Sequence, residues 1–196
     1  MTIERHIRLF DIIAPVYGLF FKYQRRMFPQ TLDVLAAHVS MKPETAVLDI
    51  GCGTGALTSV LHERGLAVTG ADASASMLRQ AKHHTKNAIP FHLVRPGEAL
   101  PFADKTFSLV VSSFVAHGLT APHRAGLYRE AKRLAKDAVV FIDYGKKRNI
   151  GASIIEFFEG GDYFNFRDNA ESEMRAHFSS VSVIPLRGLT VLYICR

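Results

Sequence analysis

The feature that most constrains this chain is an apolar run that ends in a turn of three glycines. Residues 47–55 read Val-Leu-Asp-Ile-Gly-Cys-Gly-Thr-Gly. A near-continuous apolar run is typical of a buried parallel strand, and a turn that must pass close to a ligand needs residues without a Cβ. Asp72 follows a second strand-like stretch about twenty residues on, where α/β nucleotide-binding folds place a carboxylate against ribose hydroxyls. Together the two features predict an α/β fold that binds a nucleoside.

The spacing of the glycines argues against two common nucleotide sites. The motif is G-x-G-x-G rather than the G-x-G-x-x-G of dinucleotide-binding folds, and the sequence contains no G-x-x-x-x-G-K-S/T run that would hold a triphosphate. A phosphate is therefore not the expected ligand group. The alternative is a tight turn between a strand and a helix that binds no ligand.

The strand, the glycine turn and the acidic residue resemble the first two motifs of the class I S-adenosylmethionine-dependent methyltransferases. This resemblance implies S-adenosylmethionine as cofactor and S-adenosylhomocysteine as product. It directs Asp49 and the glycine turn toward the methionine part of the cofactor and Asp72 toward the ribose, while Cys52 is expected to fill space rather than act as a nucleophile. The cofactor contacts that it implies are Tyr17, Asp49, Gly51, Cys52, Gly53, Gly55, Asp72, Ala73, Met77, Gly97, Glu98, Ala99 and Ser113.

The segment expected beside the adenine departs from the family at one position. Many members have an acidic residue two places before the position of Glu98, and this chain has Pro96 there. The adenine contact is then left to backbone groups near Gly97 and Glu98, or to the Glu98 side chain. The following residues, 100–102, have a second interpretation as a packed turn under the sheet.

Strand-like and helix-like segments alternate along the chain, which is typical of a parallel sheet covered on both faces. The expected strands are 46–50, 66–71, 89–95, 107–113, 138–144, 180–185 and 189–195, and the expected helical segments are 56–64, 74–85, 122–136 and a broken stretch over 150–178. Only residues 186–188 separate the last two strands, so these must form an antiparallel hairpin. As in the family, we predict an α/β, Rossmann-like three-layer sandwich whose seven-stranded, mostly parallel sheet has its last strand antiparallel.

Length and composition predict one domain, because 196 residues of which 48% are hydrophobic are enough for a single core. Its expected parts are an N-terminal helical lid (1–44), a cofactor-binding core (45–145), a substrate-side helical insert (146–178) and a terminal β-hairpin (179–196). The two cysteines, Cys52 and Cys195, lie far apart without a metal-binding pattern, so neither a disulfide framework nor a metal site is expected.

The catalytic residues are expected at two strand tips, because open α/β sheets bind ligands beyond the carboxyl ends of their strands. One tip delivers Ser113 and His117, and the next delivers Asp143 and Tyr144. His117 is the expected general base, since imidazole titrates near neutral pH. The alternative for His117, Asp143 and Tyr144 is packing against the cofactor. Neither tip carries the Asn/Asp-Pro-Pro-Tyr/Phe signature, which argues against methylation of DNA bases or glutamine.

The N-terminal segment 8–23 resembles the lead-in of the ubiquinone/menaquinone C-methyltransferases and of bacterial phospholipid N-methyltransferases. In that branch this helix closes over the cofactor, which implies a lid contact for Tyr17, although the branch usually has Tyr-Asp where this chain has Tyr17-Gly18. Apolar residues recur at helical spacing from Leu9 to Met27, opposed by basic residues. This stripe is either a packing face or a surface that contacts membrane lipid.

The charge of the chain bears on its partners. A net charge of +6 and a pI near 9.5 favour an anionic partner, and a basic cluster at 146–148 lies near the mouth of the expected pocket. No leader pattern and no long apolar window is found, so we expect a cytoplasmic protein without a transmembrane segment, with peripheral membrane contact as the alternative.

These observations predict a methyltransferase that acts on a small-molecule or lipid-like acceptor, anionic if the charge is informative. One alternative is an RNA methyltransferase, although RNA binding normally calls for aromatic residues beside the basic ones. Another is a regulatory protein that binds S-adenosylmethionine without turnover. The glycine spacing and the terminal hairpin disfavour a dinucleotide-dependent oxidoreductase.

Overall fold

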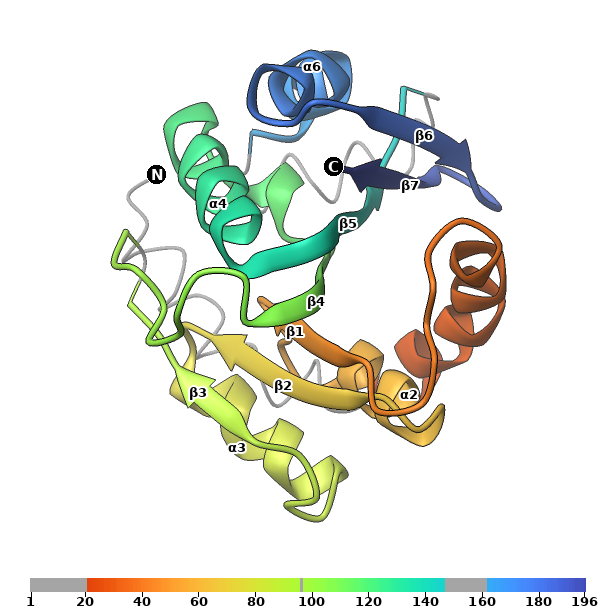
Figure 1. Ribbon diagram of the computed structural model, residues 1–196, viewed down its shortest axis with the longest axis vertical. Helices are drawn as coiled ribbons and strands as arrows, with labels where there is room; N and C mark the ends of the chain where they lie inside the picture. The colour runs from red at the N-terminus through yellow and green to blue at the C-terminus, as the bar shows by residue number, and fades with distance from the viewer. Residues whose placement is uncertain (1–20, 96, 147–161) are drawn as a thin grey trace.

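The computed structural model describes residues 21–95, 97–146 and 162–196, which form a seven-stranded sheet flanked by helices (Figure 1). Tyr17, Pro96, the basic residues 147 and 148, and the first part of the predicted helical stretch, 150–161, lie outside the described residues. The strands are β1 (Ala46–Ile50), β2 (Ala67–Asp72), β3 (Phe91–Leu93), β4 (Phe107–Ser113), β5 (Ala135–Tyr144), β6 (Val181–Pro185) and β7 (Thr190–Cys195).

The strand order is β3-β2-β1-β4-β5-β7-β6. The first five strands in this order run parallel, and β7 lies antiparallel between β5 and β6. The predicted fold class, including the reversed last strand, is confirmed. Because β1 has β2 on one side and β4 on the other, the order reverses between β1 and β4, and such a switch point is where open α/β sheets bind their ligands.

Helices cover both faces of the sheet, and the sheet divides the hydrophobic core into two clusters (Figure 1). Helices α4 (Ala121–Leu134) and α6 (Tyr163–His177) pack on one face, where Tyr128, Leu134 and Phe166 are buried. Helix α2 (Ala56–Glu63) and a helix over 21–36 pack on the other, and α3 (Ala75–His84) lies beside β2 and β3. The strands between the layers are buried on both faces, which explains their continuous apolar runs.

Two predicted boundaries are wrong. Helix α4 ends at Leu134 and β5 begins at Ala135, not at residue 138, because Ala135 already pairs with Phe107 of β4. Lys136 and Asp137 follow Ala135 and are exposed at the strand end, so the apolar pattern used to predict strands does not begin until residue 138. Strand β3 is confined to Phe91–Leu93 rather than 89–95, because only these residues pair with β2 at the sheet edge.

A buried guanidinium joins the two helices on one face of the sheet. The Arg124 side chain of α4 is fully buried, and its Nε and Nη2 each donate to a Glu173 carboxylate oxygen of α6 at 2.7 Å. Its Nη1 donates to Asp162 at 3.0 Å and also to the carbonyl oxygen of Leu119. A charge without solvent needs this full set of partners. Arg124 therefore ties α6 to the loop that precedes α4.

We expect Glu173→Gln to lower the free energy of unfolding by about 2–3 kcal/mol, because it removes the charge that compensates a buried guanidinium. The matched control is Glu171→Gln on the same helix, which breaks a half-exposed pair with Arg175 and should cost less than about 1 kcal/mol. Urea denaturation at neutral pH measures both values. Equal losses would contradict a special role for the buried pair.

Candidate active site

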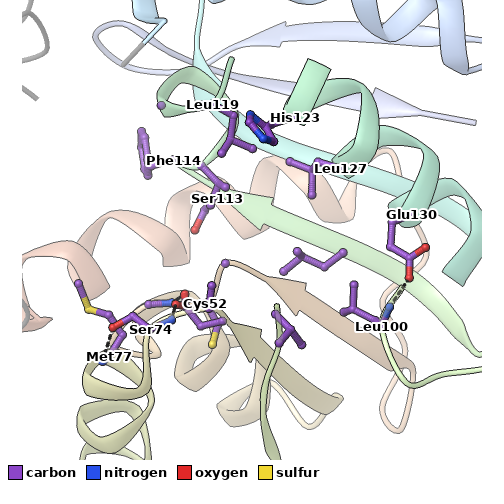
Figure 2. A pocket seen from close by; sticks show the side chains of 18 of the residues that line it. Cys52, Ser74, Met77, Leu100, Ser113, Phe114, Leu119, His123, Leu127 and Glu130 are labelled. Atoms are coloured by element: carbon purple, nitrogen blue, oxygen red, sulfur yellow. Dashed lines mark hydrogen bonds between the residues drawn. The ribbon is translucent and has the colours of Figure 1, made fainter. Parts of the chain in front are cut away.

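A cavity of about 660 Å³ opens at the switch point, within the range of pockets that bury a small ligand, about 300–1,000 Å³ (Figure 2). Cys52, Ser74 and Met77, which follow β1 and β2, face Ser113, Phe114 and Leu119, which come from the end of β4 and the loop after it. The predicted site residues that line the cavity are Gly51, Cys52, Gly53, Asp72, Ala73, Met77, Gly97, Glu98, Ala99, Ser113 and His117. The structure thus brings most of the predicted residues together.

The glycine turn forms the floor of this cavity. Gly51 has a φ of +73°, and a Cβ on it would lie 2.4 Å from Val115 Cγ2, so only glycine fits there. Gly53 also has a positive φ, +53°, but it is not crowded: a Cβ on it would meet no atom within 4 Å among the described residues. The backbone at Gly53 is therefore bare toward the cavity, as close approach of a ligand requires.

Asp72 connects the floor to the neighbouring turn. Its Oδ2 accepts from the Gly53 N–H at 2.8 Å, and its Oδ1 accepts from the Ser74 N–H at 2.8 Å. Ser74 in turn caps α3, since its hydroxyl accepts from the Met77 N–H at 3.1 Å. One carboxylate thus holds two loops in register at the cavity. Carboxylate oxygens accept more than one hydrogen bond, so these contacts are compatible with a bond to a ribose hydroxyl.

Asp49 lies behind the turn rather than on its surface. Its Oδ2 accepts from Thr58 Oγ1 at 2.6 Å, and within the described part of the chain Oδ1 is buried without a hydrogen-bond partner. The pKa of Asp49 is raised to about 7. Burial is the main cause and the nearby Asp72 carboxylate adds to it, whereas the Thr58 hydrogen bond lowers the pKa. Gly55, at the start of α2, is also turned away, because a Cβ on it would meet Ala81 at 3.2 Å.

Cys52 fills space in the turn, as expected. It is buried, and burial raises the pKa of its thiol well above the ordinary range, with Asp72 and Asp49 adding to the effect. A thiol that stays protonated is a poor nucleophile. The chemistry of the site must therefore come from other residues.

The strand tips place a histidine and an aspartate in contact. His117, in the short 3₁₀ turn Ala116–Gly118, has its Nδ1 2.7 Å from Asp143 Oδ1 at the end of β5. The other Asp143 oxygen accepts from the backbone N–H groups of Ala116 and His117, at 3.1 Å and 3.4 Å. The Tyr144 ring packs edge-on against the His117 ring, with 4.8 Å between the ring centroids. Of these predicted catalytic residues, His117 lines the cavity, while Asp143 and Tyr144 support it.

The loop after β3 is fastened by two charged residues of α4. Glu130 of α4 accepts from the Leu100 N–H at 2.7 Å, and Arg133 donates to Glu130 at 2.6 Å and to Asp104 at 2.8 Å. The hydrogen bond from Arg133 lowers the pKa of Glu130. This network was not expected from the sequence. The available signal was the i,i+3 spacing of Glu130 and Arg133, which places both on one side of a helix.

Other lining residues also went unnoticed in the sequence. The upper wall of the cavity includes Leu119, His123 and Leu127, which come from the β4–α4 connection and from α4 itself (Figure 2). Their signal was weak, because apolar residues at helical spacing normally indicate packing against the sheet. Only the position of α4 over the cavity shows that these side chains face a ligand site.

The raised pKa of Asp49 makes stability depend on pH. In the folded state Asp49 keeps its proton up to about pH 7, whereas the unfolded carboxyl loses it near pH 3.8. The contribution of Asp49 to the free energy of unfolding is therefore largest below pH 3.8 and is lost as the pH rises to about 7. We expect the stability of Asp49→Asn relative to the unaltered protein to rise between pH 5 and pH 7, by up to about 1.4 kcal/mol per pH unit. Urea denaturation at both pH values measures it, and a constant difference would show an ordinary pKa for Asp49.

Comparisons with known proteins agree with this geometry. Residues 47–138 match the family described as "Methyltransferase domain". The chain is 34% identical over 131 residues to a malonyl-[acyl-carrier protein] O-methyltransferase from Geobacter sulfurreducens, a match that covers 65% of this chain and 48% of that protein. It is 39% identical over 98 residues to a demethylmenaquinone methyltransferase from Corynebacterium urealyticum, covering 50% of this chain and 40% of that protein. The chain thus spans less than half of each relative's length.

Among solved structures, a DhpI–SAH complex aligns with a TM-score of 0.74 over 98% of this chain and 95% of that chain, at 19% identity. This likeness shows the shared fold. The comparisons confirm the predicted resemblance to methyltransferases, and the aligned DhpI structure is a complex with SAH. Residues 47–138 thus match a methyltransferase domain, and the chain has the fold of the class I S-adenosylmethionine-dependent methyltransferases.

Proposed function

We propose that this protein transfers the methyl group of S-adenosylmethionine to a small or lipid-like acceptor, at an acidic hydroxyl or an enol carbon. The observation that carries the proposal is the hydrogen bond between His117, which lines the same cavity as the glycine turn, and Asp143. A buried carboxylate on Nδ1 fixes the imidazole tautomer and directs its basic nitrogen, Nε2, away from that carboxylate. A base at this place suits acceptors whose proton must leave during the transfer.

The cofactor has a natural place across the cavity floor. Among the described residues, a Cβ on Gly53 or Gly97 would meet no atom within 4 Å, so the backbone can approach a ligand at both positions. Asp72 would accept from the ribose hydroxyls, and Gly97, Glu98 and Ala99 would contact the adenine. The Asp72 carboxylate favours the cationic sulfonium and ammonium groups of S-adenosylmethionine. A cation bound at the floor would also favour the ionised form of Asp49, which lies behind the turn, and would lower its pKa.

The proposed step is a direct displacement. The acceptor atom attacks the methyl carbon while the bond from that carbon to sulfur breaks, and the sulfur keeps the electron pair and becomes neutral. The acceptor proton passes to Nε2 of His117, and Asp143 stabilises the imidazolium that forms. The proton then leaves to solvent. Alignment of the two reactants can supply most of the rate, so the site needs few polar groups.

The names of the matched relatives support an acceptor of this class. They include an O-methyltransferase of malonyl-[acyl-carrier protein], a methyltransferase of demethylmenaquinone and a botryococcene C-methyltransferase from Botryococcus braunii. Oxygen and carbon acceptors both occur among these names. The role of His117 as a base is compatible with either, since a hydroxyl and an enol each lose a proton.

Two surface features support an anionic acceptor and a contact with lipid. Arg95 and Arg129 are exposed at the cavity rim, where they can attract an anion. On the helix over 21–36, Tyr23 and Met27 are 67% and 43% exposed, and Lys22 and Arg26 are exposed near them. An apolar and basic surface of this kind suits a cytoplasmic protein that contacts a membrane surface. Within the described residues, no helix is both long enough and apolar enough to cross a membrane.

Catalysis is tested by replacing the base and its partner. We expect His117→Gln and Asp143→Asn each to lower kcat by about 10²- to 10⁴-fold, the contribution of general base catalysis, without changing the affinity for S-adenosylhomocysteine. His62→Gln, which alters an exposed histidine of α2, is the matched control. Product formation is followed with radiolabelled S-adenosylmethionine and naphthol acceptors. Full activity of His117→Gln would leave His117 as a packing residue.

Cofactor binding is tested at two glycines that share one backbone conformation. Gly53 and Gly188 have φ values of +53° and +72°, and a Cβ on either would meet no described atom within 4 Å. We expect Gly53→Ala and Gly188→Ala to lose similar stability, about 1 kcal/mol, because both place a side chain in the left-handed region. Only Gly53→Ala should lose binding of S-adenosylmethionine in calorimetry, with NAD as the negative control. Unchanged binding would mean that the turn is structural only.

A further inference from the structure

Two imidazoles line the cavity from one short stretch of chain. His117 follows β4 and contacts Asp143, whereas His123 lies in the first turn of α4. Figure 2 shows His123 beside Leu119 on the upper wall, across the cavity from Cys52 and Met77. The reaction proposed above uses His117 and leaves His123 without a role.

A threonine holds the second imidazole in place. Nδ1 of His123 lies 2.7 Å from Oγ1 of Thr120, the residue that precedes α4. Nε2 has no hydrogen-bond partner among residues 21–95, 97–146 and 162–196, and the ring is only half-buried. The contact with Thr120 therefore orients the ring and leaves Nε2 available to a ligand in the cavity.

Nε2 of His123 can form a hydrogen bond with an oxygen atom of the ligand in either tautomer of the ring. If the Thr120 hydroxyl donates to Nδ1, Nε2 carries the proton and donates to an oxygen of the ligand, and it does so in the imidazolium as well. If Nδ1 donates to Thr120 instead, Nε2 accepts, and a ligand hydroxyl can supply that bond too. A hydroxyl on the acceptor satisfies Nε2 in every protonation state of the ring.

The wall around His123 is apolar. Phe114, Leu119 and Leu127 face the cavity beside it, and the nearest carboxylate on α4, Glu130, is already engaged by Leu100 and Arg133. A hydrogen-bonding group with apolar neighbours discriminates strongly, because a ligand that lacks the matching group leaves it unpaired.

We infer that His123 is a specificity-determining residue that binds a second oxygen of the acceptor. The acceptor is then a largely apolar molecule with two oxygen functions, of which one meets His117 and receives the methyl group while the other binds His123. This inference rests on the proposed function, since it assumes that the cofactor occupies the floor and the acceptor the upper part of the same cavity.

The test measures binding, so that it does not depend on turnover. The protein is saturated with S-adenosylhomocysteine and titrated in a calorimeter with 2,3-dihydroxynaphthalene and with 2-naphthol, which differ in one hydroxyl. We expect the diol to bind about tenfold tighter, the effect of one added hydrogen bond to a polar group in an apolar wall. His123→Leu should abolish this preference, and His123→Gln, which keeps a donor and an acceptor, should restore part of it.

Each result has one meaning. A diol preference that survives in His123→Leu overturns the inference, and so does the failure of both naphthols to bind the saturated protein. Retained affinity for S-adenosylhomocysteine shows that each variant is folded, and His62→Gln is the control for an unrelated histidine. If the unaltered protein does not bind S-adenosylhomocysteine, the proposed function itself fails, which is a separate readout from the naphthol preference.

Discussion

The Asp72 carboxylate is the contact on which the rest of the site depends. It accepts backbone N–H groups from the turn after β1 and from the turn after β2, each at 2.8 Å. These two turns form the floor of the cavity, and Asp72 joins them together with the Ala71 carbonyl oxygen, which accepts from the Gly51 and Cys52 N–H groups. The Asp72 charge also adds to the effect of burial on Asp49, whose pKa is raised to about 7. The Asp72 carboxylate at the floor suits a cation, and the backbone there is bare at Gly53.

The opposite wall is built in a different way, from contacts between elements far apart in the sequence. His117 is held by Asp143, which stands 26 residues later at the tip of the adjacent parallel strand. Leu100 is held by Glu130 of α4, 30 residues away. Arg124, fully buried, joins the loop before α4 to α6. These polar contacts orient the cavity wall, whereas the apolar clusters on the two faces of the sheet stabilise the layers.

The parts that were predictable from sequence are those in which one local stretch contains the whole signal. The apolar strand and glycine turn over 47–55 met this condition, as did the final hairpin. The start of β5 did not, because Ala135 is a strand residue only by virtue of its pairing with Phe107. Arg133 also did not, because its partner Asp104 comes from a distant loop.

By itself the sequence determined the fold, the reversed last strand and the floor of the site, because strand periodicity, a short turn and glycine spacing are local properties. It also named His117 and Asp143 as candidates, since one follows an apolar strand and the other lies at the end of the next. Only the tertiary structure decided that these two side chains share a hydrogen bond and that His123 reaches the same cavity. The physical reason is that such contacts depend on strand order and on the placement of α4, which many residues set together.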